Sequence, residues 1–235
     1  MKKIYFLIHI ILVLFSELIN AQTSMYVSTG MGGVSSFATT SAAKQEFKDI
    51  KGSPYYNKDF MFGYVEMYDS IKFSGLFRYN LYNQEMEFIF RNDTLIIDNP
   101  IKVKQICYAA KKFSYSVIVQ NAFRKNLIYG GYFEVLNQGK IQLLVKYEMD
   151  FRLNRYVAYY GGGGGDGSYR FIPSESYFMR LNIDEPAFKF KKSKRFILKM
   201  FPKNRTEISA FIRTDHIDIN KRADLIKLFE YINSL

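Results

Sequence analysis

The chain has 235 residues, of which 33 are Lys or Arg and 22 are Asp or Glu, so its formal net charge is +11 at pH 7. This charge favours anionic partners, and the single cysteine excludes an intramolecular disulfide as a support of the fold. Aromatic residues make up 17% of the chain, Trp is absent, and the length allows a substantial hydrophobic core.

The N-terminus has the pattern of a secretory signal. Lys2 and Lys3 precede an apolar run over residues 4–15, and Ala21 is a small residue suited to cleavage. The alternative is a membrane anchor, but the run is shorter than the ~20 residues that cross a bilayer. We therefore expect residues 1–21 to be removed and the protein to be exported to the periplasm or cell surface. Removal would leave 31 basic and 21 acidic residues, a net charge of +10.

Residues 22–51 are rich in Ser, Thr, Gly and Ala, and this composition predicts a flexible leader. Residues 52–190 predict an antiparallel β domain, because short alternating segments follow one another with turn residues between them. The first predicted strands are 60–67, 71–80, 84–90, 94–98, 101–108 and 113–119.

The clearest alternation lies in residues 129–152, which predict a long β-hairpin. Ile141, Leu143, Val145, Tyr147, Met149 and Phe151 fall on one face of the strand over residues 140–152. Lys140, Gln142, Lys146, Glu148, Asp150 and Arg152 fall on the other, which predicts a solvated face on which Leu144 is the exception. The partner strand 132–135 arrives through a loop that contains Gly139, where a positive φ is expected. Two more strands are predicted at 177–181 and 187–190.

Residues 191–235 change to a helical period. Phe196, Ile197, Met200 and Phe201 share a face that ends at Pro202, and Ile208, Phe211 and Ile212 form a second stripe. Leu225, Leu228, Phe229 and Ile232 form the stripe of a last helix. Asn204, with Glu207 after it, and Asn220 are predicted helix caps. The chain is thus predicted to be α+β: mainly an antiparallel β meander, open barrel-like or sandwich, with two or three C-terminal helices packed against it.

Three patches carry a resemblance to known sequences: residues 75–88, residues 132–140 and the end of the chain from Phe201. Together they resemble a group of secreted β-rich proteins from Gram-negative bacteria that have a helical C-terminal segment and no known activity. The resemblance implies export and the β-then-helix layout, and it implies no catalytic residue. Asp69-Ser70-Ile71 and Asp93-Thr94-Leu95 also resemble an acceptor for O-glycosylation in some such bacteria, although ordinary turn chemistry explains both.

Few residues suit catalysis or metal binding. After removal of His9 with the signal, His216 is the only imidazole, and Cys107 is expected to be a buried, inert thiol. One His and one Cys do not supply a zinc site. Asp166, Asp184 and Glu185 are isolated carboxylates without a calcium-loop spacing, and the glycine run 161–165 lacks the ending of a phosphate loop. No metal or cofactor is expected.

The strongest functional feature is a basic window without acidic residues, interleaved with apolar ones. Its basic residues are Lys189, Lys191, Lys192, Lys194, Arg195, Lys199, Lys203 and Arg205. This pattern is typical of a segment that lies on an anionic interface, and it is also the pattern of a helix docked on a sheet with its lysines in water. Expected partners are anionic lipid, lipopolysaccharide or acidic glycan, whereas nucleic acid is not expected.

Three functions remain open from the sequence. The first is a non-enzymatic envelope or surface accessory protein that uses the basic C-terminal segment as its contact. The second is a secreted hydrolase that uses a carboxylate pair or Cys107 with His216. The third is an outer-membrane β-barrel, which long alternating strands favour and the helical C-terminus disfavours.

Overall fold

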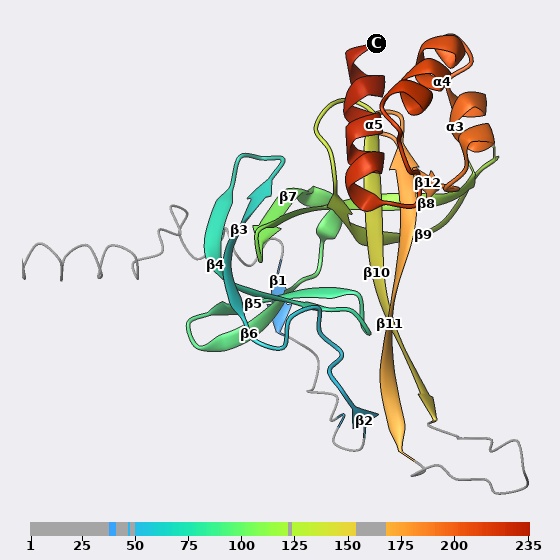
Figure 1. Cartoon of the computed structure of the whole chain (residues 1–235). Helices are drawn as coiled ribbons and strands as arrows, with labels where there is room; N and C mark the ends of the chain where they lie inside the picture. Colours follow the sequence, from blue (N-terminus) through green and yellow to red (C-terminus); the bar gives the residue numbers. More distant parts are fainter. Residues whose placement is uncertain (1–37, 41–46, 48–49, 122–123, 154–167) are drawn as a thin grey trace, which may run out of the picture.

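The computed structural model describes residues 38–40, 47, 50–121, 124–153 and 168–235. Within them the chain is mainly β, with three helices at the C-terminus packed against the sheet (Figure 1). This confirms the predicted α+β class. The predicted signal sequence, most of the predicted leader, and the segment that includes residues 161–166 lie outside the described residues.

The strands and helices follow the predicted order, and most shared boundaries agree within two residues. The strands are β1 (Ala38–Thr40), β2 (Ile50–Lys51), β3 (Met61–Met67), β4 (Lys72–Asn80), β5 (Glu85–Phe90), β6 (Asp93–Ile97), β7 (Val103–Tyr108), β8 (Lys111–Asn121), β9 (Arg124–Val135), β10 (Gln142–Leu153), β11 (Tyr169–Arg180) and β12 (Ala187–Lys189). A 3-10 turn covers Pro100–Lys102, and the helices are α3 (Lys194–Met200), α4 (Arg205–Thr214) and α5 (Arg222–Ser234).

The first part of the sheet is the predicted meander. Strands run in the order β1-β6-β5-β4-β3-β7-β8, and every neighbouring pair is antiparallel. Their buried face carries a core rich in aromatic residues, among them Phe73, Phe77, Tyr79, Phe88 and Phe113. Several of these rings pack edge to face, which adds to the stabilisation from apolar burial. Thr94, the first residue of the predicted strand 94–98, lies in β6 opposite Ile89, and Asp93, predicted to lie in the turn, begins that strand.

The second part of the sheet closes on itself. β8 pairs with β12, β12 with β11, β11 with β10, β10 with β9, and β9 again with β8. The β8–β12 pair is parallel, as is the β2–β11 pair, so the sheet is mixed, although most of its pairs are antiparallel as predicted. The interior of this five-stranded ring contains an apolar cluster of Ile118, Phe133, Leu144, Phe178 and Ala187.

The ring also buries residues that were predicted to be solvated. Gln142 and Lys146 share the inner face with Leu144, and each is about as buried as the core. Lys146 fits because Gly131 lies against its methylene chain, where a Cβ atom would collide, and its ammonium reaches Glu148 at 2.6 Å. Leu144 is therefore no exception to the alternation, since both faces of this half of β10 are covered.

The three helices cover the outer face of the ring. Leu143 and Val145 of β10 and Met179 of β11 pack in one cluster with the helical residues, among which Leu225, Leu228, Phe229 and Ile232 are buried as predicted. The predicted caps are wrong in detail. Asn204 precedes α4 but its side chain makes no capping hydrogen bond, and α5 begins after Lys221, with the side chain of Asn220 bonded to Asp218.

The hairpin that was predicted around β10 has a different main partner. β10 pairs with β9 at only two positions, whereas it pairs with β11 at twelve, from Gln142 opposite Arg180 to Leu153 opposite Tyr169. The far half of the β10–β11 pair projects away from the helices as an arm (Figure 1). Gly139 has the expected positive φ, +107°, in the loop that joins β9 to β10.

Candidate functional site

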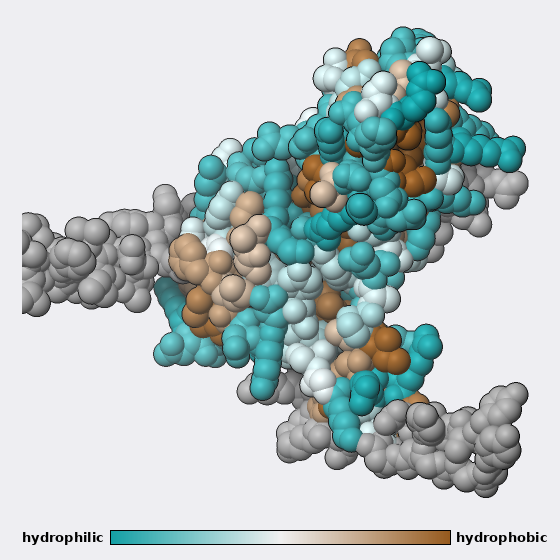
Figure 2. Space-filling model, viewed as in Figure 1, coloured by the Kyte–Doolittle hydropathy of each residue, from teal (hydrophilic) through white to brown (hydrophobic). Residues whose placement is uncertain are grey.

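The predicted basic window lies where the sheet passes into the helices. Lys189 ends β12, Lys191 and Lys192 lie in the connection to α3, and Lys194, Arg195 and Lys199 belong to α3. Lys203 lies between α3 and α4, and Arg205 begins α4. All eight residues except Lys192 are exposed, and the outer surface of these helices is largely hydrophilic (Figure 2).

Two of the eight cations are held against the sheet. The Lys189 ammonium donates a hydrogen bond to the Ser176 hydroxyl at 2.8 Å. The Lys192 ammonium lies 3.6 Å from the centre of the Tyr177 ring, within cation–π range. These contacts fix the base of the window, while the residues further along it project from the helices.

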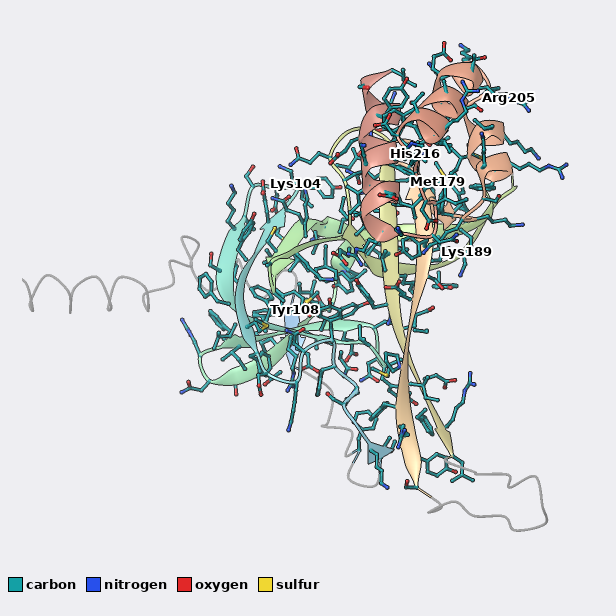
Figure 3. All side chains as sticks on the ribbon, viewed as in Figure 1. Lys104, Tyr108, Met179, Lys189, Arg205 and His216 are labelled. Carbon is teal, nitrogen blue, oxygen red and sulfur yellow. The ribbon has the colours of Figure 1, made fainter. Side chains whose placement is uncertain are left out.

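A basic groove lies between α3 and α4. Its volume is about 470 Å³, and it is lined by Lys194, Leu198, Arg205, Thr206, Ser209, Ala210 and Arg213. Three cationic side chains and two hydroxyls thus converge on it, and no lining residue is acidic. Figure 3 shows Arg205 at the helical end of the molecule, far from the arm. The groove has the chemistry of an anion site, since Arg, Lys and hydroxyl groups are donors to phosphate and carboxylate.

The sequence analysis missed Arg213. It lies four residues beyond Ser209 and eight beyond Arg205, so the three occupy one face of α4. The helical period of Ile208, Phe211 and Ile212 already defined the neighbouring apolar face. If the basic residues had been placed on the same helical period, Arg213 would have been added to the predicted set of contact residues.

A second polar group lies where β8, β9 and β10 meet the start of α5. The Glu134 carboxylate, only 8% exposed, accepts from the Lys111 ammonium at 2.9 Å and lies 2.5 Å from the Arg222 guanidinium. The Tyr147 hydroxyl also donates to Glu134, and accepts from Lys111 at 3.0 Å and from Arg222 at 3.1 Å. We call these four residues the Glu134 cluster.

The Glu134 cluster shifts the titration of its members. Burial alone would raise the pKa of Glu134, but hydrogen bonds from Tyr147, Arg222 and Lys111 outweigh it and lower the pKa below the ordinary value. Burial and the bond to Glu134 raise the pKa of Tyr147 to about 12. The carboxylate is therefore held ionised between two cations, which suits a structural ion pair and does not suit a general acid.

The predicted nucleophile and base lie in different parts of the fold. Cys107 is half-buried in β7, opposite Tyr64 and Lys112, whereas His216 is exposed in the linker between α4 and α5 (Figure 3). Asp184 and Glu185 lie exposed in the turn between β11 and β12. Among the described residues, no group of three or more His, Cys, Asp or Glu side chains is arranged to hold a metal ion.

An apolar patch lies on the outer face of β3 and β4. Phe62 lies directly opposite Leu76 in the strand pair and is 65% exposed, with Tyr64 two residues further along the same face. A patch of this kind can mark a contact with another molecule. Nothing in the structure indicates what would cover it.

Comparison with known proteins gave no match to a family model, a curated protein or a solved structure. In the part of the chain that the structure describes, no helix is long and apolar enough to cross a membrane.

Proposed function

We propose that this is an exported, non-enzymatic accessory protein of the cell envelope or surface that binds anionic surfaces through its basic helical end. The observation that carries this proposal is the groove between α3 and α4, whose lining includes Lys194, Arg205 and Arg213 and no acid. The occupant would be a phosphate or carboxylate group of an anionic lipid, lipopolysaccharide or acidic glycan.

The start of α4 adds to the attraction. Its first backbone N–H groups have no partner within the helix, and the Asn204 side chain does not cap them. Arg205 and Thr206, which line the groove, are the first two residues of this ten-residue helix. The positive end of the helix dipole therefore has the same sign as Arg205 at that end, where Glu207 is the one acidic residue of the first turn, whereas Arg213 lies in the last turn.

The packing of the helices supports a role at a surface. Ile197, Ile208 and Phe229 are turned inward and buried against the sheet, so the apolar faces are already used. Binding would then rest on charge and would require no insertion of the helices into hydrocarbon. Each Lys or Arg near an anionic leaflet is worth about 1 kcal/mol, and this attraction falls off within a Debye length of about 10 Å at 0.1 M salt.

The test is co-sedimentation of the protein, without residues 1–21, with vesicles of phosphatidylglycerol or of phosphatidylcholine. We expect binding to the anionic vesicles alone, with loss at 0.5 M NaCl. Replacing Lys194, Arg205 and Arg213 together by Gln should weaken binding ~100-fold, which corresponds to three contacts of about 1 kcal/mol each.

The matched control removes three positive charges elsewhere. Lys58, Lys102 and Lys112 are exposed on the β part of the molecule, and their joint replacement by Gln gives the same change in net charge. Equal loss of binding in both triple variants would show that only total charge matters, and would overturn the assignment to the groove.

A further inference from the structure

One face of the β10–β11 pair is covered at both ends and open in the middle. Near the helices, Leu143, Val145 and Met179 are buried beneath α5. Towards the tip, Phe151 and Phe171 contact the rings of Tyr82 and Phe47. Between these covers lies a cavity of about 490 Å³. It is lined by Gly52, Ser53, Tyr55, Tyr56, Leu81, Tyr147, Met149, Phe171, Pro173, Ser174 and Glu175.

The lining combines ring faces with hydroxyl groups. Tyr56 and Tyr147 lie with ring centres 4.9 Å apart, and Phe171 supplies a further ring. Ser53 and Tyr55 bring hydroxyls from the segment before β3, and Glu175 of β11 is an exposed carboxylate of the lining. An exposed carboxylate at the rim does not suit an acyl chain, whereas aromatic surface with a few polar groups is typical of sites for small ligands.

The charges around the cavity disfavour an ionic ligand. The Lys111 ammonium lies 5.0 Å from the ring centre of Tyr56 and 5.1 Å from that of Tyr147, so these rings already hold a cation. A second cation would be repelled by Lys111, and an anion would be repelled by Glu175. A neutral ligand avoids both costs.

The cavity is fixed before any ligand arrives. Tyr147 is held by the Glu134 cluster, and the Tyr55 ring lies 3.7 Å from the Arg78 guanidinium while its backbone bridges to Asn80. Pro173 has no backbone N–H, but the β10–β11 pair loses no hydrogen bond through this. Tyr177 directs its carbonyl to Phe190, away from β10, and the two-residue period gives Pro173 the same orientation. Such preorganisation lowers the entropy cost of binding.

We propose that this cavity binds a neutral saccharide. The apolar C–H face of a pyranose ring would stack on the half-buried Tyr56, and its hydroxyls would bond Ser53 and Glu175. This inference is independent of the basic groove between α3 and α4, which shares no lining residue with the cavity.

The experiment is calorimetric titration of the protein, without residues 1–21, with cellohexaose, maltohexaose and chitohexaose. We expect saturable binding of at least one of them. The double variant Ser53→Ala/Glu175→Ala, which alters no packed ring, should weaken this binding at least fivefold, and Tyr56→Leu, which keeps apolar bulk but removes the ring, at least tenfold. Tyr68→Ala, an exposed aromatic outside the cavity, should leave it unchanged.

Two results would overturn the proposal. One is the absence of saturable binding with all three oligosaccharides, measured on protein whose circular dichroism shows a folded sheet. The other is binding that the Ser53/Glu175 double variant and Tyr56→Leu leave unchanged. If an uncharged Gly-Phe-Ser peptide binds saturably and none of the sugars does, the cavity is a peptide site. That result would also overturn the saccharide proposal.

Discussion

The guanidinium of Arg222 lies 2.5 Å from the carboxylate of Glu134, and this contact joins the first turn of α5 to β9. Arg222 is the first residue of its helix, and Glu134 is the penultimate residue of its strand. The pair therefore anchors the end of α5 that lies nearest the saccharide cavity. Because Lys111 and Tyr147 share the same carboxylate, its removal would leave two cations without their anionic partner.

We expect Glu134→Gln to lower the free energy of unfolding by about 3–5 kcal/mol, the usual cost of removing one partner from a buried ion pair. Urea unfolding followed by circular dichroism measures this change. Glu230→Gln is the matched control, because Glu230 is exposed on α5, the helix that carries Arg222. It should change the free energy of unfolding by less than about 0.5 kcal/mol. Equal effects of the two variants would refute the structural role of the cluster.

The same carboxylate predicts a dependence of stability on pH. The pKa of Glu134 is lower in the folded protein than its ordinary value of 4.5, so its contribution is complete above pH 4.5 and is lost as the pH falls through the folded pKa. Between pH 7 and pH 3 the wild type should lose more stability than Glu134→Gln. Parallel stability curves for the two proteins over this range would contradict the prediction.

The far end of α5 is held by an asparagine. The Asn233 side chain accepts a hydrogen bond from the backbone N–H of Ile141 at 2.9 Å and donates to its carbonyl at 2.8 Å. Asn233→Ala should cost about 1–3 kcal/mol, because the half-buried backbone N–H of Ile141 loses its partner, whereas the carbonyl keeps a hydrogen bond from Asn137. Asn220→Ala, in the exposed linker before α5, is the control. The thermal midpoint of Asn233→Ala should lie below that of Asn220→Ala.

Gly139 faces that same asparagine. Its φ of +107° is strained for any residue with a side chain, and an added Cβ would come within 2.6 Å of the Asn233 side chain. Gly139→Ala should therefore destabilise the protein by about 1–3 kcal/mol. A variant with Ala at this position and unchanged stability would mean that the loop does not rest on α5.

The core beneath the helices makes the largest prediction for a single side chain. Phe229 is fully buried and packs edge to face on Phe190. Phe229→Ala should cost about 3–5 kcal/mol through lost burial and the cavity that remains. Phe62→Ala removes the same atoms from an exposed position and should cost little. Chemical unfolding of the two variants therefore shows whether the loss of stability comes from the burial of the ring or from removing a phenyl group as such.

The sequence predicted the elements whose residues alternate in one consistent pattern. The strands from β3 to β7 bury mainly one face, and their periods predicted the correct segments, although Glu87 of β5 is buried on the other face beside Arg78. In β10 the same rule identified the strand but assigned Gln142 and Lys146 to water, because nothing local indicates that the sheet closes and buries the second face. The far half of β11 was missed because Pro173 interrupts it and its side chains do not alternate.

The sites depended on contacts that are distant in sequence. The basic window was visible because its members are neighbours, whereas Arg213 joins them only through the period of α4. The Glu134 cluster takes one residue each from β8, β9, β10 and α5, so no spacing in the sequence reveals it. The saccharide cavity likewise unites residues 52–56 with β10 and β11.

The most direct test of surface binding is hydrogen–deuterium exchange of the protein, without residues 1–21, in the presence of phosphatidylglycerol vesicles. The account predicts added protection in peptides that cover residues 194–213, and unchanged exchange in β3 and β4, whose outer face carries the apolar patch around Phe62. Protection of β3 and β4 with none in α3 and α4 would contradict it, because contact would then occur through the apolar patch.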